Sequence, residues 1–251
     1  MGAKVEKMPS PAEPNIDNVL AAFLKSQRKR LGKKTFSSYE STVELLKGYL
    51  NGYAYQSLSK PEGRLFDRHF NATGKEHREF CQLFGPEKIA ENLGGFLGEF
   101  MIRKVMAGES FKRTSGTVCK KLSKWLADEG YISEAVAEEG ASLGALASRE
   151  LVDAERAARL LHEAAERLAL DVRAVEDEDY VEFDHFTIAR VEPGQIWLEV
   201  WEADGRPHPR GPIPAPKPAT RLLQKGWDVS CALVRHRGAW RMVEVANVYP
   251  R

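Results

Sequence analysis

Two groups of side chains have the chemistry that a metal or a catalytic step would need. His69, His77 and Cys81 fall in one short segment, and the spacing of His77 and Cys81 places an imidazole and a thiol on one face of a helix. Because three ligands of mixed type in an irregular segment are a weak pattern, we expect a surface histidine pair beside a buried cysteine, and no metal. Asp184 and His185 are adjacent on an expected strand, so alternation sends them to opposite faces. No Ser or Cys stands in a nucleophile elbow, and nothing indicates a cofactor.

A second chemical signal is a pair of tryptophans in the run QIWLEVW. Alternation along a strand places Ile196, Leu198 and Val200 on one face. The other face carries a possible partner-binding group, formed by Trp197, Glu199 and Trp201. Exposed aromatic rings can stack on bases or enclose a cation. The alternative is that both tryptophans pack under the neighbouring proline-rich loop or against helices.

Charge is distributed unevenly along the chain of 251 residues, although the net charge is only +1. Residues 1–132 contain 22 Lys and Arg against 15 Asp and Glu, whereas residues 133–180 contain 5 against 13. This asymmetry predicts a basic module that can meet a polyanion, followed by an acidic segment. A chance fluctuation of segment charge is the alternative.

Cysteine spacing and hydropathy narrow the class of protein. Cys81, Cys119 and Cys231 are far apart and form no CxxC pair, which fits neither a disulfide framework nor a zinc ribbon. Residues 1–15 are polar and proline-rich, so we expect a disordered tail rather than a signal peptide. No stretch approaches the ~20 apolar residues of a membrane span. We therefore predict a cytoplasmic protein without membrane association.

The region from Ile16 to about Ile132 has helical periodicity. Asn15 can cap a first helix that ends near Gly32, and a second helix begins at Thr35 or Ser37. Residues 53–85 are expected to form a loop with one short helix at 77–84. A third helix is expected from Pro86 to about Met106, and a fourth over 110–129 with an apolar face formed by Val118, Leu122, Trp125 and Leu126.

Residues 133–170 continue the helical pattern. Residues 149–170 are strongly helical, and their small and aliphatic side chains form a heptad seam at Leu151, Ala154, Ala158, Leu161, Ala165 and Leu168. Because three of these six positions are Ala, a partner helix would have to approach closely. We expect a hairpin with residues 133–147. The alternative is a homodimer formed through residues 149–170.

After residue 179 the pattern is that of short strands. β-rich runs at 180–191, 195–203, 227–236 and 239–249 are separated by turns that contain glycine. Residues 205–223 contain six prolines, too many for a central strand, so we expect a long loop or edge segment that ends in a helical turn near 219–223. These runs predict a small antiparallel barrel, and weakly resemble SH3-like or OB-type barrels.

The helical region resembles the N-terminal core-binding domain of tyrosine recombinases and phage integrases, a four-helix SAM-like fold. In VLAAFLKSQRKRLGKKTFSSYESTVELLKGYL, residues 19–50, the first helix has a basic end and Tyr39 follows Thr35 by one turn. In SFKRTSGTVCKKLSKWLADEGYI, residues 110–132, the family's L-aromatic-L core and Gly-aromatic stop correspond to Leu122, Trp125, Leu126, Gly130 and Tyr131. The resemblance covers about 115 residues, and the stretch near 60–84 is longer than the family's usual connection.

The resemblance implies contacts to DNA from the start of the second helix and from one face of the fourth. Lys and Arg neutralise phosphates, and hydroxyls near a helix N-terminus donate to phosphate oxygens. The implied DNA-binding residues are Lys33, Lys34, Thr35, Ser37, Ser38, Lys112, Arg113, Thr117, Lys120, Lys121 and Lys124. The alternative is that this basic surface is merely solvated.

The recombinase catalytic residues are missing. Strand transfer needs an HxxR pair, but the third position after each of the six histidines holds Ala, Phe, Ala, Ile, Gly or Ala. We therefore predict no enzyme, but a multidomain α plus β protein. Its expected parts are the tail at 1–15, a SAM-like domain at 16–132, an acidic helical connector at 133–178 and a β-barrel at 179–251.

The predicted function is non-catalytic binding of double-stranded DNA, with a protein or RNA partner at the barrel. One alternative is a protein-interaction adaptor that binds no nucleic acid. The other is an RNA-binding accessory factor that holds nucleic acid on its barrel.

Overall fold

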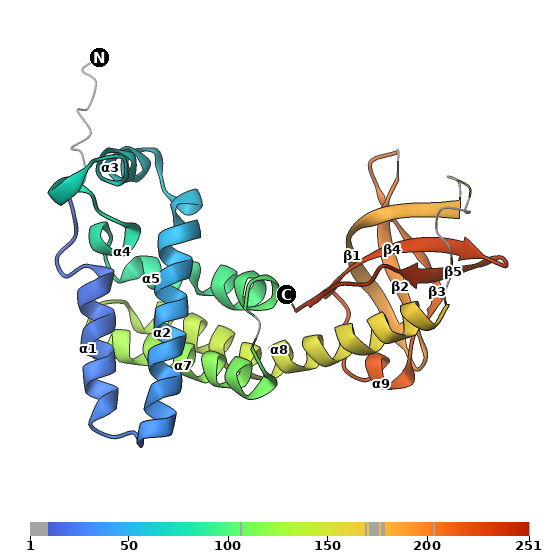
Figure 1. The fold of residues 1–251 in the computed structure, drawn as a ribbon, viewed down its shortest axis with the longest axis horizontal. Coiled ribbons are helices and arrows are strands. Elements are labelled where there is room, and N and C mark those ends of the chain that lie inside the picture. Colours follow the sequence, from blue (N-terminus) through green and yellow to red (C-terminus); the bar gives the residue numbers. More distant parts are fainter. Residues whose placement is uncertain are drawn as a thin grey trace, which may run out of the picture. The chain divides into compact units, whose positions relative to one another are not determined.

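The chain has an α plus β fold made of two compact units, which confirms the predicted fold class at that level (Figure 1). The computed structural model describes residues 10–105, 107–168, 170, 176, 179–202 and 204–250. The first unit, called here the helical unit, consists of Met1–Phe100 and Thr114–Leu146. The second, called the sheet unit, consists of Met101–Arg113 and Ala147–Arg251. Of the predicted disordered tail at 1–15, residues 1–9 lie outside the described residues. The prediction is wrong for the described end of this segment, because the amide of Ala12 donates to the carbonyl of Leu83 at 2.8 Å.

The predicted boundaries at residues 132 and 178 do not coincide with this division. Helix α7 (Glu109–Asp128) and helix α8 (Glu134–Leu168) both cross from one unit into the other. The predicted connector is therefore not a separate part, because each half of α8 belongs to the core of a different unit. None of the described helices is long and apolar enough to cross a membrane.

Helices α1 (Ile16–Arg28) and α2 (Lys33–Tyr53) form the first hairpin of the helical unit. Asn15 caps α1 as predicted, since its side chain accepts a hydrogen bond of 3.0 Å from the amide of Asn18. Helix α1 ends at Arg28, before Gly32. Helix α2 then begins at Lys33, directly after Gly32 and earlier than the predicted Thr35 or Ser37.

Residues 53–85 are more helical than predicted. They form η1 (Ala54–Ser57), α3 (Lys60–Phe70), η2 (Gly74–Glu76) and α4 (Phe80–Leu83). Helix α3 was missed because Pro61 and Gly63 read as loop signals. Pro61 occupies the first turn of the helix, where a backbone N–H would have no acceptor within the helix, so its missing N–H costs nothing. The helix start is also stabilised by a capping box, in which the backbone amide of Ser59 donates to Glu62 Oε2 at 2.8 Å.

The predicted third helix is divided into three segments. Helix α5 (Glu87–Gly95) passes into a π-helical turn, η3 (Phe96–Phe100), and then into α6 (Met101–Arg103). Met106, its predicted end, lies outside the described residues. The fourth helix, α7, is confirmed: Val118, Leu122 and Leu126 are buried, and the ring of Trp125 lies 5.5 Å from that of Phe23 in α1.

Helix α8 is one continuous helix, so the predicted hairpin within residues 133–170 is wrong. Gly140 and Gly144 suggested an interruption, but in the helical unit they allow α8 to pack closely on α7. A Cβ atom at Gly144 would lie 2.5 Å from the amide nitrogen of Lys120 and 2.6 Å from the carbonyl oxygen of Gly116. These glycines therefore serve helix packing, at the usual cost in helix propensity.

The sheet unit contains an antiparallel sheet with the strand order β3-β2-β1-β4-β5, and β6 pairs with β4. Its strands are β1 (Tyr180–Glu192), β2 (Gln195–Trp201), β3 (Pro207–Pro214), β4 (Asp228–His236), β5 (Ala239–Val243) and β6 (Val248–Tyr249). Strands β3 and β5, at the two ends of this order, contact each other, and the guanidinium of Arg210 lies 5.2 Å from the ring of Trp240. The sheet thus curls toward a barrel.

The proline-rich segment forms the edge strand β3, followed by helix α9 (Lys217–Thr220). An edge position tolerates prolines because the missing amide donors can face away from the ladder. The predicted edge segment is therefore confirmed, and the helical turn begins slightly earlier than expected.

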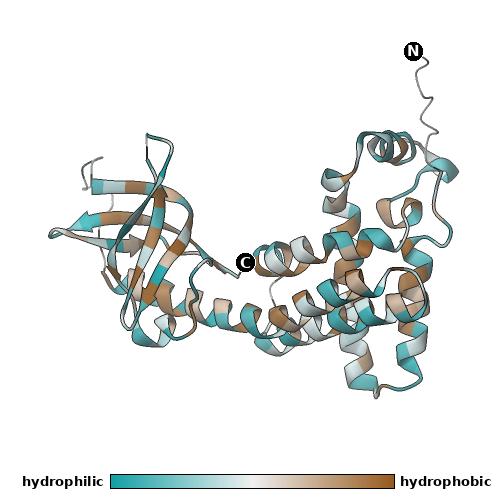
Figure 2. Ribbon diagram, turned by 180° about the vertical axis from the view of Figure 1, so that it is seen from behind, coloured by the Kyte–Doolittle hydropathy of each residue, from teal (hydrophilic) through white to brown (hydrophobic). Residues whose placement is uncertain are grey.

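The middle of the heptad seam of α8 packs against the sheet of its own chain. Ala154, Ala158 and Leu161 are buried in one hydrophobic cluster with Ile188 of β1 and Leu198 of β2. Figure 2 shows hydrophobic positions recurring along this helix and alternating along the strands. The small Ala side chains let the sheet approach, so these three positions do not need the partner helix of the alternative homodimer.

Candidate nucleic-acid interface

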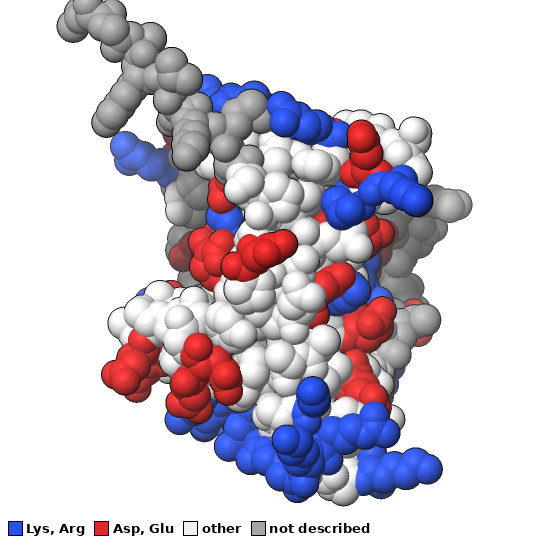
Figure 3. All heavy atoms as spheres, turned by 90° about the vertical axis from the view of Figure 1, so that its left-hand side faces the viewer, with Lys and Arg blue, Asp and Glu red and all other residues white. Residues whose placement is uncertain are grey.

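Six basic side chains gather where α1 passes into α2. This group, called here the basic turn, consists of Lys25, Arg28, Lys29, Arg30, Lys33 and Lys34, all of which are exposed. No acidic residue occurs between Asp17 and Glu40 in the sequence, so the turn contains no carboxylate of its own. Figure 3 shows Lys and Arg side chains massed at the lower end of the helical unit, over this turn.

Local contacts hold the arginines of the basic turn in place. Arg30 Nε donates to Gln27 Oε1 at 2.8 Å, and Gln27 is buried. The guanidinium of Arg28 lies 5.5 Å from the ring centroid of Phe36, the first buried residue of α2. Burial raises the pKa of Tyr39, while the nearby charge of Arg30 acts in the opposite direction. These contacts hold the guanidinium groups of Arg28 and Arg30 against the α1–α2 hairpin, while the lysine side chains extend into solvent.

The N-terminus of α2 lies within the basic turn. Gly32 is the N-cap and supplies no side-chain hydrogen bond, and the first turn contains no acidic residue. The first amides of a helix point outward and carry the positive end of its dipole, so they can donate to an anion. Thr35 and Ser37 are exposed here, whereas the half-buried Ser38 hydroxyl donates to the carbonyl of Lys34 at 3.4 Å.

The residues of the predicted basic face of α7 lie in two different environments. Thr117 and Lys121 are exposed. Lys120 and Lys124 line a groove of about 470 Å³ between α7 and α8, together with three carboxylates, those of Asp128, Glu134 and Glu138. Because opposite charges at close range offset one another, the two lysines present less net positive charge than the sequence indicates.

The prediction for Lys112 has to be corrected. Its side chain is only 8% exposed, and its Nζ forms an ion pair of 3.1 Å with Glu155 Oε2 of α8. Both Lys112 and the exposed Arg113 belong to the sheet unit, whereas Thr117 and the lysines that follow belong to the helical unit. An ammonium that is buried and paired cannot reach a phosphate, so Lys112 leaves the predicted DNA-binding set.

The two tryptophans of β2 have different environments. Trp197 is half-buried: the guanidinium of Arg190 lies 4.7 Å from its ring, and a Cβ atom at Gly211 would overlap that ring. Trp201 is 70% exposed, and Glu199 is half-buried. The aliphatic face of β2 is buried as predicted. Of the predicted partner-binding group, only Trp201 therefore presents a broad open surface.

The histidines considered for metal binding have backbone partners. His69 Nδ1 lies 3.3 Å from the carbonyl oxygen of Glu76, and His77 Nδ1 lies 2.9 Å from that of Phe70. Cys81 is buried, and burial raises the pKa of its thiol. No group of three possible ligands that could hold a metal ion occurs within the part of the chain that the structure describes.

The sequence reasoning missed four residues of the basic turn. Arg28, Lys29 and Arg30 were interpreted only as the basic end of the first helix, where such residues suit the helix dipole, and Lys25 was not singled out. The available signal was the long interval without Asp or Glu, which joins these residues to Lys33 and Lys34 as one group.

No family model, no curated protein and no solved structure matches this chain. The resemblance to integrase core-binding domains therefore depends on the residues quoted for it, and a function has to be argued from the site itself.

Proposed function

We propose that this protein binds double-stranded DNA without cleaving it, and that the basic turn is the main contact to the phosphate backbone. One observation carries the proposal: six exposed Lys and Arg side chains lie at the end of α1 and at the uncapped start of α2, in an interval of the sequence without Asp or Glu. Both the side chains and the helix amides favour an anion at this place.

The position of the lysines supports an anionic ligand. Lys33 and Lys34 stand at the positive end of the α2 dipole, where a basic residue costs about 0.5 kcal/mol in folding stability. A phosphate placed among them reverses the sign of that interaction. A bound polyanion would therefore offset this cost in the complex. Arg and Lys directed at phosphates carry no base readout, so the proposed binding is independent of sequence.

The test is fluorescence anisotropy of the full chain with a labelled duplex, a single strand and an RNA of equal length. If all six side chains meet phosphates, the logarithm of the binding constant should fall with the logarithm of salt concentration with a slope of about −5. The full chain is needed because Ala137 and Ala141 of α8 are buried in the helical unit, so a fragment ending at residue 132 would lose part of its core.

Replacing Lys29, Lys33 and Lys34 by Ala should reduce the magnitude of this slope by about three. The matched control replaces Lys60, Arg64 and Lys75, which are exposed elsewhere on the helical unit, and should leave the slope almost unchanged. Equal effects of the two variants would reject the basic turn as a site. Stronger binding of the RNA than of the duplex would favour the accessory-factor alternative.

The adaptor alternative has one observation in its favour, the exposed indole of Trp201 in the sheet unit. Trp is costly to leave in water and is enriched at interfaces. If the chain is an adaptor, Trp201→Ser should abolish capture of a partner protein, and the unmodified chain should show no salt-dependent DNA binding. Strong duplex binding by Trp201→Ser would leave the first proposal standing.

A further inference from the structure

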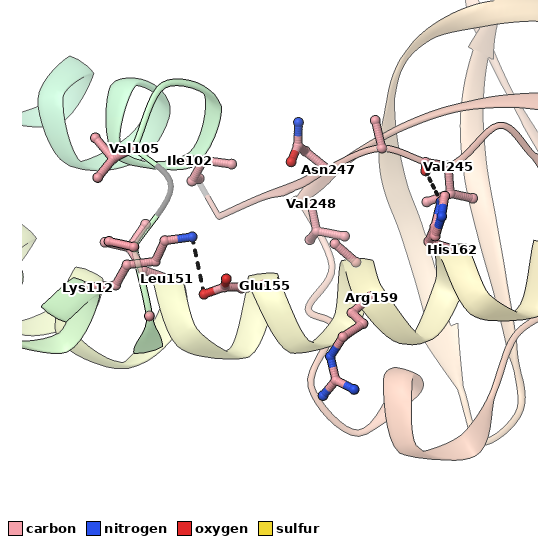
Figure 4. Close-up of a pocket in the computed structure, with 14 residues that line it drawn as sticks. Ile102, Val105, Lys112, Leu151, Glu155, Arg159, His162, Val245, Asn247 and Val248 are labelled. Atoms are coloured by element: carbon pink, nitrogen blue, oxygen red, sulfur yellow. Dashed lines mark hydrogen bonds and ion pairs between the residues drawn. The ribbon is translucent and has the colours of Figure 1, made fainter. Parts of the chain in front are cut away.

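A groove of about 910 Å³ lies within the sheet unit, bounded by α6, the start of α7, α8 and the segment that leads into β6 (Figure 4). Most of its lining is apolar, with Ile102, Val105, Leu151 and Val248 as the larger side chains. Leu151 and Val248 are buried, while Ile102 and Val105 are half-buried at the rim. Small-molecule sites have this size and this mainly apolar lining with few polar groups.

The polar feature of the groove is the ion pair between Lys112 and Glu155, drawn as a dashed line in Figure 4. The side chain of Lys112 is 8% exposed, and Glu155 is its ion-pair partner. An ammonium has three N–H donors, so the capacity for further acceptors remains. Glu155 Oε2 is buried and receives no aligned hydrogen bond from a described residue. Buried charges normally use their hydrogen-bonding capacity, because leaving it unused is costly.

Arg159 and His162 also line the groove, but both are engaged elsewhere. The Arg159 side chain extends away from the groove in Figure 4, and its guanidinium lies 3.5 Å from Glu163. His162 Nδ1 donates to the carbonyl of Val245 at 2.9 Å, which ties α8 to the segment before β6. The charges available to a ligand inside the groove are therefore those of Lys112 and Glu155, one of each sign.

We propose that this groove binds an α-amino acid with a large apolar side chain. The ligand carboxylate accepts hydrogen bonds from Lys112, its ammonium donates to Glu155, and its side chain lies against Ile102, Val105 and Val248. In an α-amino acid the two charged groups are roughly 3 Å apart, because both are attached to one carbon. This matches the 3.1 Å between Lys112 Nζ and Glu155 Oε2. A ligand with only a negative charge would be repelled by the Glu155 carboxylate, and one with only a positive charge would be repelled by the Lys112 ammonium. A ligand with both charges avoids both repulsions.

The proposal is separate from DNA binding, since the groove lies in the sheet unit and its test contains no DNA. The first experiment is calorimetric titration of the full chain with L-leucine, L-leucinamide and N-acetyl-L-leucine. Leucinamide lacks the carboxylate and N-acetyl-leucine lacks the ammonium, so each should bind at least tenfold more weakly than leucine. Affinity should rise about fourfold for each added methylene between alanine and leucine.

Two substitutions assign the contacts. In Lys112→Met, leucine should lose its advantage over leucinamide, and in Glu155→Gln it should lose its advantage over N-acetyl-leucine. The control is Glu109→Gln, which breaks the neighbouring pair between α7 and α8, where Arg156 Nε donates to Glu109 Oε1 at 2.8 Å outside the groove. Glu109→Gln should bind leucine as the unmodified chain does.

A third variant fills the groove without touching the ion pair. Ile102→Trp should lose leucine binding while its circular dichroism spectrum stays unchanged. If leucine does not bind at about 10 mM, tenfold above the dissociation constant of an ordinary millimolar site, the proposal is rejected. It is also rejected if all three ligands bind equally, or if Glu109→Gln weakens binding as much as Lys112→Met does, because the pair would then be structural only.

Discussion

The basic turn and the lysines of α7 are similar in sequence but differ in their surroundings. In the basic turn, six cations are exposed with no acidic residue nearby in the chain. Along α7, Lys112 is buried against Glu155, and Lys120 and Lys124 line a groove with three carboxylates. The same residue type therefore offers a free charge in one region and an offset charge in the other.

The cause of the difference is helix α8. Its first half brings Glu134 and Glu138 to Lys120 and Lys124 in the helical unit, and its second half brings Glu155 to Lys112 in the sheet unit. The acidic segment that the sequence placed in a connector thus pairs with Lys112 and lines one groove with Lys120 and Lys124. Among the residues that the structure describes, no carboxylate forms an ion pair with the turn between α1 and α2. The positive charge that a helix can offer to a phosphate depends on which carboxylates pack beside it. Counting Lys and Arg along the sequence does not predict this.

The largest expected effect is on DNA binding by a charge reversal in the basic turn. Lys29→Glu, Lys33→Glu and Lys34→Glu in one chain should weaken duplex binding at low salt about a thousandfold, close to 4 kcal/mol, because three phosphate contacts become repulsive. The measurement is anisotropy at fixed low salt. A loss of less than tenfold would place the DNA contact elsewhere.

The same variant provides its own control for folding. Glu at positions 33 and 34 interacts favourably with the dipole of α2, whereas Glu at position 29, the C-cap of α1, interacts unfavourably with the dipole of that helix. Two favourable changes against one unfavourable change should leave the thermal unfolding temperature equal or slightly higher. Lower stability together with weaker binding would mean that the lysines support the fold, and the binding result would lose its meaning.

The next largest effect is expected where α8 packs on α7. Gly144→Ala should destabilise the helical unit by about 3 kcal/mol, because the new Cβ would meet backbone atoms of Gly116 and Lys120 that cannot move independently. Gly48→Ala, with no atom near its Cβ in the interior of α2, should stabilise by about 0.5–1 kcal/mol. Urea unfolding measures both. Equal effects would contradict the close packing of α7 and α8.

Breaking the buried pair should have a smaller effect on stability. Lys112→Met removes the partner of Glu155 and should cost about 2 kcal/mol, less than for a fully buried pair, because the Glu155 side chain is 39% exposed. Lys121→Met, on the exposed face of the same helix, should change stability by less than about 0.5 kcal/mol. A cost for Lys112→Met as small as that for Lys121→Met would mean that its charge is solvated and could serve DNA after all.

The sequence predicted the parts of the fold that local patterns determine. The cap at Asn15, the apolar face of α7 and the buried aliphatic face of β2 all follow from residue types at fixed spacing. The prediction from sequence was wrong where a residue type is explained by packing against a distant part of the chain. Gly140 and Gly144 suggested a break in α8, but Gly144 faces the backbone of α7, and Gly140 faces the side chains of Ser123 and Leu93. No local pattern reveals these neighbours.

The candidate sites were predictable to a lesser extent for the same reason. Lys33 and Lys34 were identified, but Lys112 looked equivalent to them in the sequence. Its burial depends on Glu155, which is 43 residues further along the chain and reaches it only through the fold. Likewise, alternation placed Trp197 and Trp201 on one face, while the packing of Gly211 against Trp197 left only Trp201 exposed.

The smallest expected effect tests the offset charge of α7 directly. Glu134→Gln and Glu138→Gln together remove two of the three carboxylates that line the groove with Lys120 and Lys124. These lysines should then contribute to phosphate binding, so duplex affinity at low salt should rise about threefold and the salt slope should grow by about one. The control is Asp67→Asn with Glu76→Gln, which removes the same charge from exposed positions outside this groove. If both pairs raise affinity equally, only the net charge matters, and α7 has no place in the site. If only the first pair does so, the lysines of α7 lie close enough to the DNA to act once their carboxylates are gone.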